Sequence, residues 1–180
     1  MIPEPSLIKS KTPEEIRLQI AALVQQYSDI VYEPKNFIPD TSIIPPSGKS
    51  LGSEELKNMV EASLDGWLTT GRFNVEFEKR LAKFIGVRSA ITVNSGSSAN
   101  LVAFNTLTSP LLGERAIKPG DEVIGVAAGF PTTVNPILQF GAVPVFVDID
   151  PKTHNIDASK IEVAIGPKTK AIMLAHSLGN

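Results

Sequence analysis

"EVIGVAAGFPTTVNPILQFGAVPVFVD", residues 122–148, contains two short apolar runs separated by a segment of helical length. The runs, at 122–127 and 143–148, are almost continuously hydrophobic and lack the polar alternation of a strand that has one face in water. The segment between them, at about 132–140, has room for a short helix. A strand, a helix and a second strand in this order predict a parallel α/β unit.

The same alternation continues on both sides of this unit. "SAITV" at 89–93 predicts an earlier strand, and a helix is expected to follow it at 97–107. Further along the chain, a predicted helix at 159–165 precedes a fourth apolar run, "KAIMLA", at 170–175. The sequence therefore predicts an α/β fold with a mostly parallel sheet flanked by helices.

The first half of the chain predicts helices without strands. Residues 12–27 begin with a hydroxyl cap, a proline and a glutamate three residues after the cap, and apolar residues then recur at helical spacing. Two more helices are expected at 54–66, capped by Ser53, and at 74–86, which ends in a glycine. These elements precede the α/β pattern and add helices to its N-terminal side.

A proline-containing stretch at 34–46 divides this helical half and predicts an extended arm. We therefore expect an N-terminal helix and arm over residues 1–44. Residues 45–180 are expected to form the first, incomplete part of a larger α/β domain.

The composition narrows the classes of function. A net charge of −2 gives no electrostatic reason to expect binding to nucleic acid or to an anionic membrane. No apolar run approaches the roughly 20 residues that span a bilayer, and no secretory signal pattern is present, so a cytoplasmic protein is expected. The chain has no cysteine and can supply neither a disulfide nor a thiolate metal site.

A cluster of small polar residues, "NSGSSAN", lies at the turn between the first predicted strand and its helix. Ligands gather at such strand ends in parallel sheets, and helix N-termini attract anions. Ser95, Ser97 and Ser98 offer hydroxyl donors, and Gly96 allows close approach of the backbone. The stretch fits a phosphate-binding loop and fits equally a tight turn with an ordinary helix cap. It matches neither the dinucleotide fingerprint nor the Walker loop.

Residues that follow the other predicted strands add candidates at the same edge. Phe130 could stack on a flat cofactor ring at this edge. The sequence pattern alone favours another interpretation, in which Phe130 is an apolar residue that fills the space beneath the loop. Thr132, Thr133 and Asn135 are either polar ligand contacts or residues that start a helix. His176, after the fourth strand, fits a ligand contact as well as a structural role.

Two further groups have weaker patterns. Trp67, with Thr70 and Gly71, fits a binding segment or a core residue followed by a turn. Asp148 and Asp150 form a carboxylate pair, but "VDIDPKT" is more typical of a strand end and turn. No metal site is therefore predicted.

Five stretches can be considered together: "GWLTTGRFNVEFEKRLAKFIGV", "SGSSAN", "KPGDEVIGVAAGFPTTVNP", "GAVPVFVDIDPKTHNID" and "KTKAIMLAHSLGN". From about Pro45 to Asn180 the chain resembles the DegT-type sugar aminotransferases, vitamin B6-dependent enzymes with the aspartate-aminotransferase (type I) fold. The wording of "TSPLLGERAIKPGDEV" and "AAGFPTTVNP" is most similar to the CDP-4-keto-6-deoxyglucose 3-dehydrase branch. That branch removes the 3-hydroxyl of the sugar in the formation of 3,6-dideoxyhexoses of lipopolysaccharide.

The resemblance implies roles for the candidate residues. The loop that binds the phosphate of pyridoxal or pyridoxamine phosphate corresponds to Ser95, Gly96, Ser97 and Ser98. Phe130 corresponds to the aromatic residue over the pyridine ring, and His176 to a histidine near the cofactor. The family's contacts to the nucleotide sugar correspond to Trp67, Thr70, Gly71, Thr132 and Thr133.

The resemblance also implies what lies outside this chain. The family's catalytic residue, a lysine in the aminotransferases and a histidine in the 3-dehydrases, is expected downstream of Asn180, so no catalytic residue is assigned here. The implied enzyme uses pyridoxamine or pyridoxal phosphate on a CDP-linked keto-deoxy sugar and forms a homodimer. An iron–sulfur cluster and a flavin or iron–sulfur reductase are further implied, with the cluster's cysteines outside this chain.

Two alternatives stay open beside a 3-dehydrase. One is a vitamin B6-dependent nucleotide-sugar aminotransferase. The other is a non-catalytic fragment or a nucleotide-binding α/β module.

The type I fold implies particular strand neighbours. Within residues 1–180, only the strands at 122–127 and 143–148 are expected to be adjacent, while those at 89–93 and 170–175 are not neighbours. Expressed alone, the chain is therefore expected to be inactive and not a cooperatively folded monomer.

Overall fold

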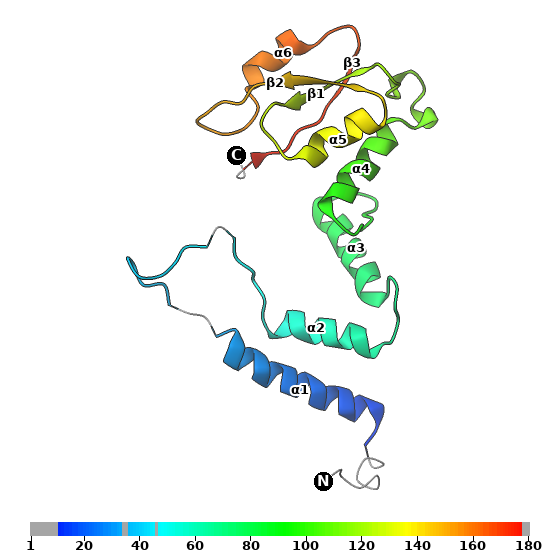
Figure 1. Cartoon of the computed structure of the whole chain (residues 1–180). Helices are drawn as coiled ribbons and strands as arrows, with labels where there is room; N and C mark the ends of the chain where they lie inside the picture. Colours follow the sequence, from blue (N-terminus) through cyan, green and yellow to red (C-terminus); the bar gives the residue numbers. More distant parts are fainter. Residues whose placement is uncertain (1–10, 34–35, 46, 178–180) are drawn as a thin grey trace. The chain divides into compact units, whose positions relative to one another are not determined.

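The computed structural model describes residues 11–33, 36–45 and 47–177 (Figure 1). The chain divides into two compact units, Met1–Ala90 and Ile91–Asn180, called unit 1 and unit 2 below. Each unit is described by itself. The predicted division at residue 44 stays a prediction.

Unit 1 begins with helix α1, Pro13–Val31, whose start is set by local hydrogen bonds. The backbone N–H of Glu15 donates to Thr12 Oγ1 at 3.2 Å, and the N–H of Thr12 donates to Glu15 Oε2 at 2.7 Å. This reciprocal arrangement satisfies two N–H groups that a helix end otherwise leaves unpaired. The start predicted from Thr12, Pro13 and Glu15 is confirmed, and the helix continues four residues past its predicted end.

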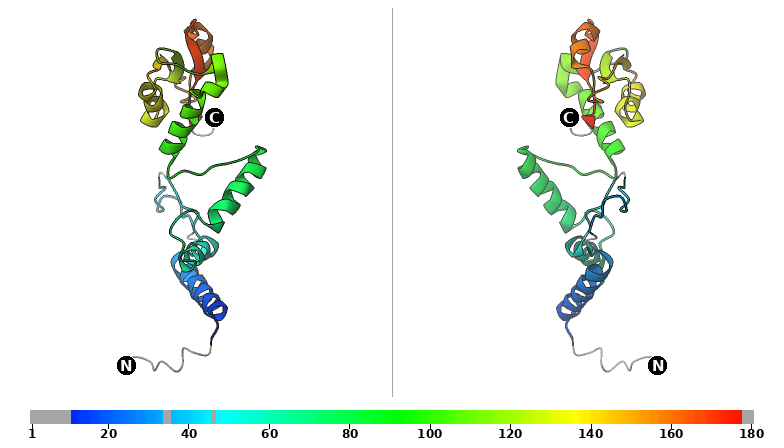
Figure 2. Two further views of the ribbon diagram at one scale, coloured as in Figure 1. Left: turned by 90° about the vertical axis from the view of Figure 1, so that its right-hand side faces the viewer. Right: turned by 90° about the vertical axis from the view of Figure 1, so that its left-hand side faces the viewer.

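Helices α2, Ser53–Leu64, and α3, Arg72–Ile85, follow, and α1 packs against α2 (Figure 1, Figure 2). The cap of α2 is Gly52 rather than the predicted Ser53, which is the first helical residue. The Glu55 carboxylate accepts the N–H of Gly52 at 2.7 Å, so the cap is satisfied without a side chain on residue 52. Helix α3 ends at Gly86, whose φ of 79° is the left-handed conformation that glycine adopts without strain.

An ion-pair cluster links the three helices of unit 1. Arg17 of α1 lies 2.6 Å from Glu61 of α2 and 3.2 Å from Asp65, which follows α2. Arg72, the first residue of α3, lies 2.7 Å from Asp65 and 3.2 Å from Glu61. The hydrogen bond from Arg72 is the main cause that lowers the pKa of Asp65. The four residues are called the Arg17–Arg72 cluster below.

Unit 2 alternates helices with short strands. It contains α4 (Gly96–Leu107), the 3₁₀ segment η2 (Pro110–Arg115), β1 (Glu122–Val126), α5 (Pro131–Gln139), β2 (Val143–Val147), η3 (Ala158–Lys160), α6 (Ile161–Ala164) and β3 (Thr169–Ile172). The predicted helix at 159–165 is thus divided between η3 and α6. Helix α5 packs on β1 and β2 and against α4.

The three strands form a parallel sheet in the order β2-β1-β3. Ile124 of β1 pairs with Val145 of β2 and with Ile172 of β3. β1 lies in the middle of the sheet, and four of its five residues are buried. In β2 only Val147 is buried, and in β3 partly buried residues alternate with exposed ones. The predicted α/β fold with a parallel sheet is confirmed.

Two expectations about the strands are wrong. Residues 89–93 are not a strand in the described structure, and Ile91 remains 81% exposed. The pairing of β1 with β3 shows that β1 and β2 are not the only adjacent strands. The expectation that 89–93 and 170–175 are not neighbours is consistent with the sheet order.

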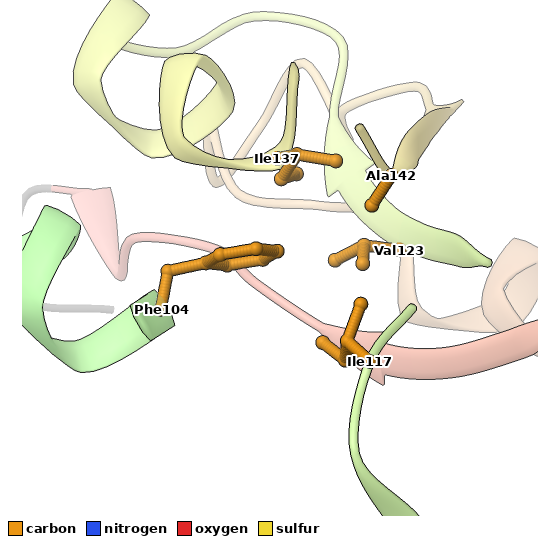
Figure 3. Packing of buried hydrophobic residues seen from close by; sticks show 5 residues of the cluster. All are labelled: Phe104, Ile117, Val123, Ile137 and Ala142. Atoms are coloured by element: carbon orange, nitrogen blue, oxygen red, sulfur yellow. The ribbon is translucent and has the colours of Figure 1, made fainter. Parts of the chain in front are cut away.

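The core of unit 2 lies between the sheet and the helices α4 and α5. It contains Phe104, Ile117, Val123, Ile137 and Ala142, shown in Figure 3. The Phe104 ring also contacts the Phe140 ring, with 5.6 Å between centroids. This packing fixes α4 and α5 against β1, and with them the start of each helix.

Candidate functional site: the carboxyl edge of the sheet

The carboxyl ends of the three parallel strands share one edge of the sheet. The segment 127–130 follows β1, the segment 148–157 follows β2, and the segment 173–177 follows β3. In open α/β sheets this edge is where ligands bind. Of the six residues proposed from the sequence for cofactor binding, Phe130 and His176 lie in these segments, and the other four lie at the start of α4.

The N-terminus of α4 carries the serine-rich loop. Ser95 is the cap: its Oγ accepts the N–H of Ser98 at 3.1 Å and donates to Ser98 Oγ at 3.2 Å. The N–H of Ala99 donates to the Ser95 carbonyl at 3.0 Å, so the N–H groups of Gly96 and Ser97 lie outside the helical ladder. An added Cβ on Gly96 would meet nothing within 4 Å, so the space beside the Cα of this residue is open.

The start of α5 lies beside the start of α4. The Asn100 side chain donates to the Thr132 carbonyl at 3.4 Å and joins the two helices. A hollow of about 220 Å³ between them is lined by the polar residues Ser97, Ser98, Thr132, Asn135 and Gln139, and also by Leu101 and Pro136. The structure therefore brings the predicted loop residues and Thr132 together.

Gln139 is the polar lining residue that the sequence analysis missed. Thr132, Asn135 and Gln139 are separated by three and four residues, which places them on one face of α5. That helical spacing was visible in the sequence. It became informative only once Thr132 was known to face α4.

Phe130 and Thr133 occupy contrasting positions. Phe130 is the N-cap of α5 and is 69% exposed, so it does not fill the core of this chain. Thr133 is only 7% exposed and is not among the residues that line the hollow. Its predicted role as a sugar contact stays a prediction.

His176 follows β3 and is exposed at the same edge. The next residue, Ser177, is bound through its backbone by the Asn155 side chain, at 2.7 Å and 3.2 Å. Asp148 and Asp150 lie in the segment after β2, where their carboxylates accept the N–H groups of Ile149 and Lys152. Both aspartates thus take part in the turn predicted from the sequence.

The remaining predicted residues lie in unit 1. Trp67 Nε1 donates to the Thr70 carbonyl at 3.0 Å, and Gly71 is the N-cap of α3. Together with Arg72 they line a hollow of about 340 Å³. An added Cβ on Gly71 would lie 3.4 Å from Trp67 Cδ1, so the indole packs directly against this glycine. These residues form a local group within unit 1.

Two searches of the described residues give negative results. Within the described residues, 11–33, 36–45 and 47–177, no helix is long and apolar enough to cross a membrane. Over the same part of the chain, no three or more acidic, histidine or cysteine side chains are grouped so as to hold a metal ion.

Comparison with known proteins decides the family. Residues 49–180 match the DegT/DnrJ/EryC1/StrS aminotransferase family. The chain belongs to this family. The resemblance to DegT-type enzymes is confirmed. The type I fold is confirmed as well, because the solved structures that the chain matches have this fold.

Individual relatives refine the comparison. The lipopolysaccharide biosynthesis protein RfbH of Salmonella typhimurium is 64% identical over 169 residues, which are 94% of this chain and 39% of that protein. A dTDP-4-dehydro-2,6-dideoxy-D-glucose 3-dehydratase of Saccharopolyspora spinosa is 47% identical over 90% of this chain and 35% of its own length. The DegT-family chain thus spans less than two fifths of the curated relatives it matches.

A solved structure gives the same comparison in three dimensions. The E coli GDP-4-keto-6-deoxy-D-mannose-3-dehydratase with bound hydrated PLP matches with a TM-score of 0.63 and 34% identity. The match covers 71% of this chain and 32% of that one. The elements that carry the candidate site therefore belong to a fold known from a sugar 3-dehydratase.

Proposed function

We propose that the chain forms the cofactor-phosphate region of a vitamin B6-dependent enzyme that acts on a nucleotide-linked 4-keto-6-deoxy sugar. The proposed reaction is removal of the 3-hydroxyl, in the formation of 3,6-dideoxyhexoses for lipopolysaccharide. The identities to RfbH and to a sugar 3-dehydratase support this choice. The observation that carries it is the polar hollow where α4 and α5 begin side by side.

The donors around this hollow fit a phosphate group. The free N–H groups of Gly96 and Ser97 and the positive end of α4 favour an anion. The hydroxyls of Ser97, Ser98 and Thr132 can donate to its oxygens, and no carboxylate is among the described lining residues. Pyridoxal or pyridoxamine phosphate is the cofactor that we propose for this position.

The aromatic ring and the histidine at the same edge extend the proposed cofactor site. Phe130, exposed at the start of α5, offers its ring as a face on which the flat cofactor can stack. His176, in the exposed segment that follows β3, is proposed as a further contact to the cofactor. When bound, the cofactor supplies an electron sink next to the sugar carbon that loses its hydroxyl.

The proposed sugar contacts divide between the two units. Thr132 and Thr133 are proposed from α5, and Trp67, Thr70 and Gly71 from the segment before α3. The hydrogen bond from Trp67 to the Thr70 carbonyl orders that segment, which supports its use as a preformed surface for a ligand.

The whole protein is proposed to be a cytoplasmic homodimer that acts on a CDP-linked sugar. Its catalytic residue, its iron–sulfur cluster and the contact to a flavin or iron–sulfur reductase are proposed to come from outside residues 1–180. The chain itself has no cysteine for a cluster.

A nucleotide-sugar aminotransferase is the second candidate, favoured by the aminotransferase members that name the family. The products distinguish the two. The whole protein, incubated with a CDP-linked 4-keto-6-deoxy sugar and a reducing system, is expected to yield a 3-deoxy sugar. A 4-amino sugar formed with an amino donor would establish the aminotransferase instead.

The phosphate assignment is tested separately with the double variant Ser97→Ala/Ser98→Ala in the whole protein. Each lost hydrogen bond to a charged phosphate should weaken cofactor binding about tenfold or more. The matched control is Ser63→Ala/Ser159→Ala, which removes two exposed hydroxyls far from the loop in sequence. Equal cofactor retention by the two double variants after dialysis would rule out the assignment.

A further inference from the structure

The Asn155 side chain forms a clamp on the segment that follows β3. Its Oδ1 accepts the N–H of Ser177 at 2.7 Å, and its Nδ2 donates to the Ser177 carbonyl at 3.2 Å. Nδ2 also donates to the Thr153 carbonyl at 3.1 Å. One amide side chain therefore binds both the backbone N–H and the backbone carbonyl of a residue 22 positions further along the chain.

The partners fix the orientation of the amide. The Ser177 N–H can only donate, and the two carbonyls can only accept, so oxygen must face the N–H and nitrogen the carbonyls. In this orientation Nδ2 donates two hydrogen bonds and Oδ1 accepts one. An amide group of this length is the side chain that offers an acceptor and two donors in one plane.

The clamp is anchored in a segment that is ordered by its own hydrogen bonds. The N–H of Asp150 donates to the Asn155 carbonyl at 2.9 Å, and the N–H of Asp157 donates to the Asp148 carbonyl at 2.9 Å. Ile149 and Ile156 form an antiparallel bridge between these two bonds. Asn155 is thereby held on the segment that begins directly after β2.

On the other side, the sheet holds the chain only as far as Met173. The N–H of Met173 donates to the Ile124 carbonyl of β1 at 2.8 Å. The backbone of Ser177, four residues further on, is tied to another segment by the two hydrogen bonds to the Asn155 side chain. His176 lies between these two attachments and directly beside the clamped peptide.

We propose that Asn155 is a positioning residue that fixes His176 at the carboxyl edge of the sheet, where the proposed function uses the histidine as a cofactor contact. The inference rests on the proposed function for the role of His176. The clamp itself rests on the hydrogen bonds alone. Asn155 acts through the Ser177 backbone and needs no contact with cofactor or substrate.

The test uses the whole protein with its cofactor, in the variants Asn155→Ala, Asn155→Asp and His176→Ala. Asn105→Ala is the matched control, because Asn105 is an exposed asparagine of α4. Two properties are measured. Hydrogen exchange of the Ser177 amide is followed by mass spectrometry of overlapping peptides, and the absorbance band of the bound cofactor is followed as a function of pH.

Loss of the clamp should raise the exchange rate of the Ser177 amide about tenfold in Asn155→Ala. Asn155→Asp should give an intermediate rate, because the carboxylate keeps the acceptor for the N–H but loses both donors. It also provides the comparison if the alanine variant does not fold. Asn155→Ala and His176→Ala should shift the pH dependence of the cofactor band in the same direction, and Asn105→Ala should change neither property.

Unchanged exchange of Ser177 in both Asn155 variants would overturn the clamp. Faster exchange with an unchanged cofactor band would overturn the positioning of His176, while a shifted band in His176→Ala would leave the proposed function standing. If His176→Ala also leaves the band unchanged, the role of His176 in the proposed function fails and the inference fails with it.

Discussion

Unit 2 buries nine apolar residues of the described chain, whereas Ala82 is the one buried apolar residue described in unit 1. Five of the nine meet in one core around Val123 and Ile137, to which a strand, two helices and loops contribute. In unit 1 the helices leave large apolar side chains such as Phe84 and Ile30 at 89% and 79% exposure. The two units therefore differ in what holds them together.

Unit 1 relies on caps and on exposed ion pairs. The Arg17–Arg72 cluster connects α1, α2 and α3, but its members are partly open to water, where ion pairs contribute little. Burial of apolar surface, which unit 2 has and unit 1 largely lacks, is the dominant favourable term in folding. Regular helices with good caps therefore do not by themselves make a stable unit.

The largest expected effect concerns residues 1–180 expressed alone. We expect no dehydrase or aminotransferase activity and no cooperatively folded monomer, because unit 1 exposes apolar helix faces and residues 89–93 do not join the described sheet. Sedimentation and thermal melting measure this directly. A soluble monomer with a sharp two-state melt and well-dispersed amide NMR signals would contradict it.

The next effect compares the buried apolar residues of the two units within the whole protein. Phe104→Ala in unit 2 should lower the free energy of unfolding by about 3–5 kcal/mol, because it empties a site that is 1% exposed. Ala82→Gly in unit 1 should lower it by about 1 kcal/mol, through helix propensity. Urea unfolding of the cofactor-free protein gives both values. Equal losses would mean that the two units are held together in the same way.

A third comparison uses one exposed aromatic residue from each unit, Phe130 at 69% and Trp67 at 66% exposure. Phe130→Ala should weaken cofactor binding about three- to tenfold through lost ring stacking, and should shift the absorbance of the bound cofactor. Trp67→Ala should weaken substrate binding and leave cofactor binding unchanged. Spectroscopic titrations with cofactor and with CDP-sugar separate the two.

Stability serves as the control for this pair. Because Phe130 lies outside the core of this chain, Phe130→Ala should leave the melting temperature of the cofactor-free protein nearly unchanged. A large drop would restore the interpretation of Phe130 as an apolar plug.

The smallest expected effect concerns the Arg17–Arg72 cluster. The pKa of Asp65 is lowered, chiefly by the hydrogen bond from Arg72. A carboxyl with a lowered folded-state pKa stabilises the fold above its unfolded pKa, and that contribution is lost as the pH falls through the folded value. The ion pairs of unit 1 should therefore weaken only in acid, below the usual aspartate range of about 4.

NMR titration of the carboxyl groups measures this effect. Arg72→Gln should raise the pKa of Asp65 toward its ordinary value. Arg80→Gln is the control, since Arg80 lowers the pKa of Glu76 and does not contact Asp65. An Asp65 pKa that is the same in wild type and Arg72→Gln would show that the cluster does not form in solution.

The sequence by itself determined the features that depend on near neighbours. Thr12 and Glu15 set the start of α1, Ser95 the start of α4, and Gly86 the end of α3, because caps join atoms three to five residues apart. The apolar run of β1 was also evident, since burial on both faces leaves a continuous hydrophobic pattern. The similar run of β2 predicted a strand as well, although this strand is partly exposed. The serine loop was recognised as the local turn that starts α4, although the strand predicted before it is not a strand in the described structure.

The tertiary structure alone decided the features that depend on distant partners. The sequence could not show that β3 lies beside β1, or that residues 89–93 stay outside the sheet, because a strand forms only when another segment supplies its hydrogen bonds. Gln139 joined the candidate site only through the packing of α5 against α4. Asn155 and Ser177 are 22 residues apart, and their pairing follows from the parallel order of β2 and β3 around β1, which brings the ends of distant strands to one edge.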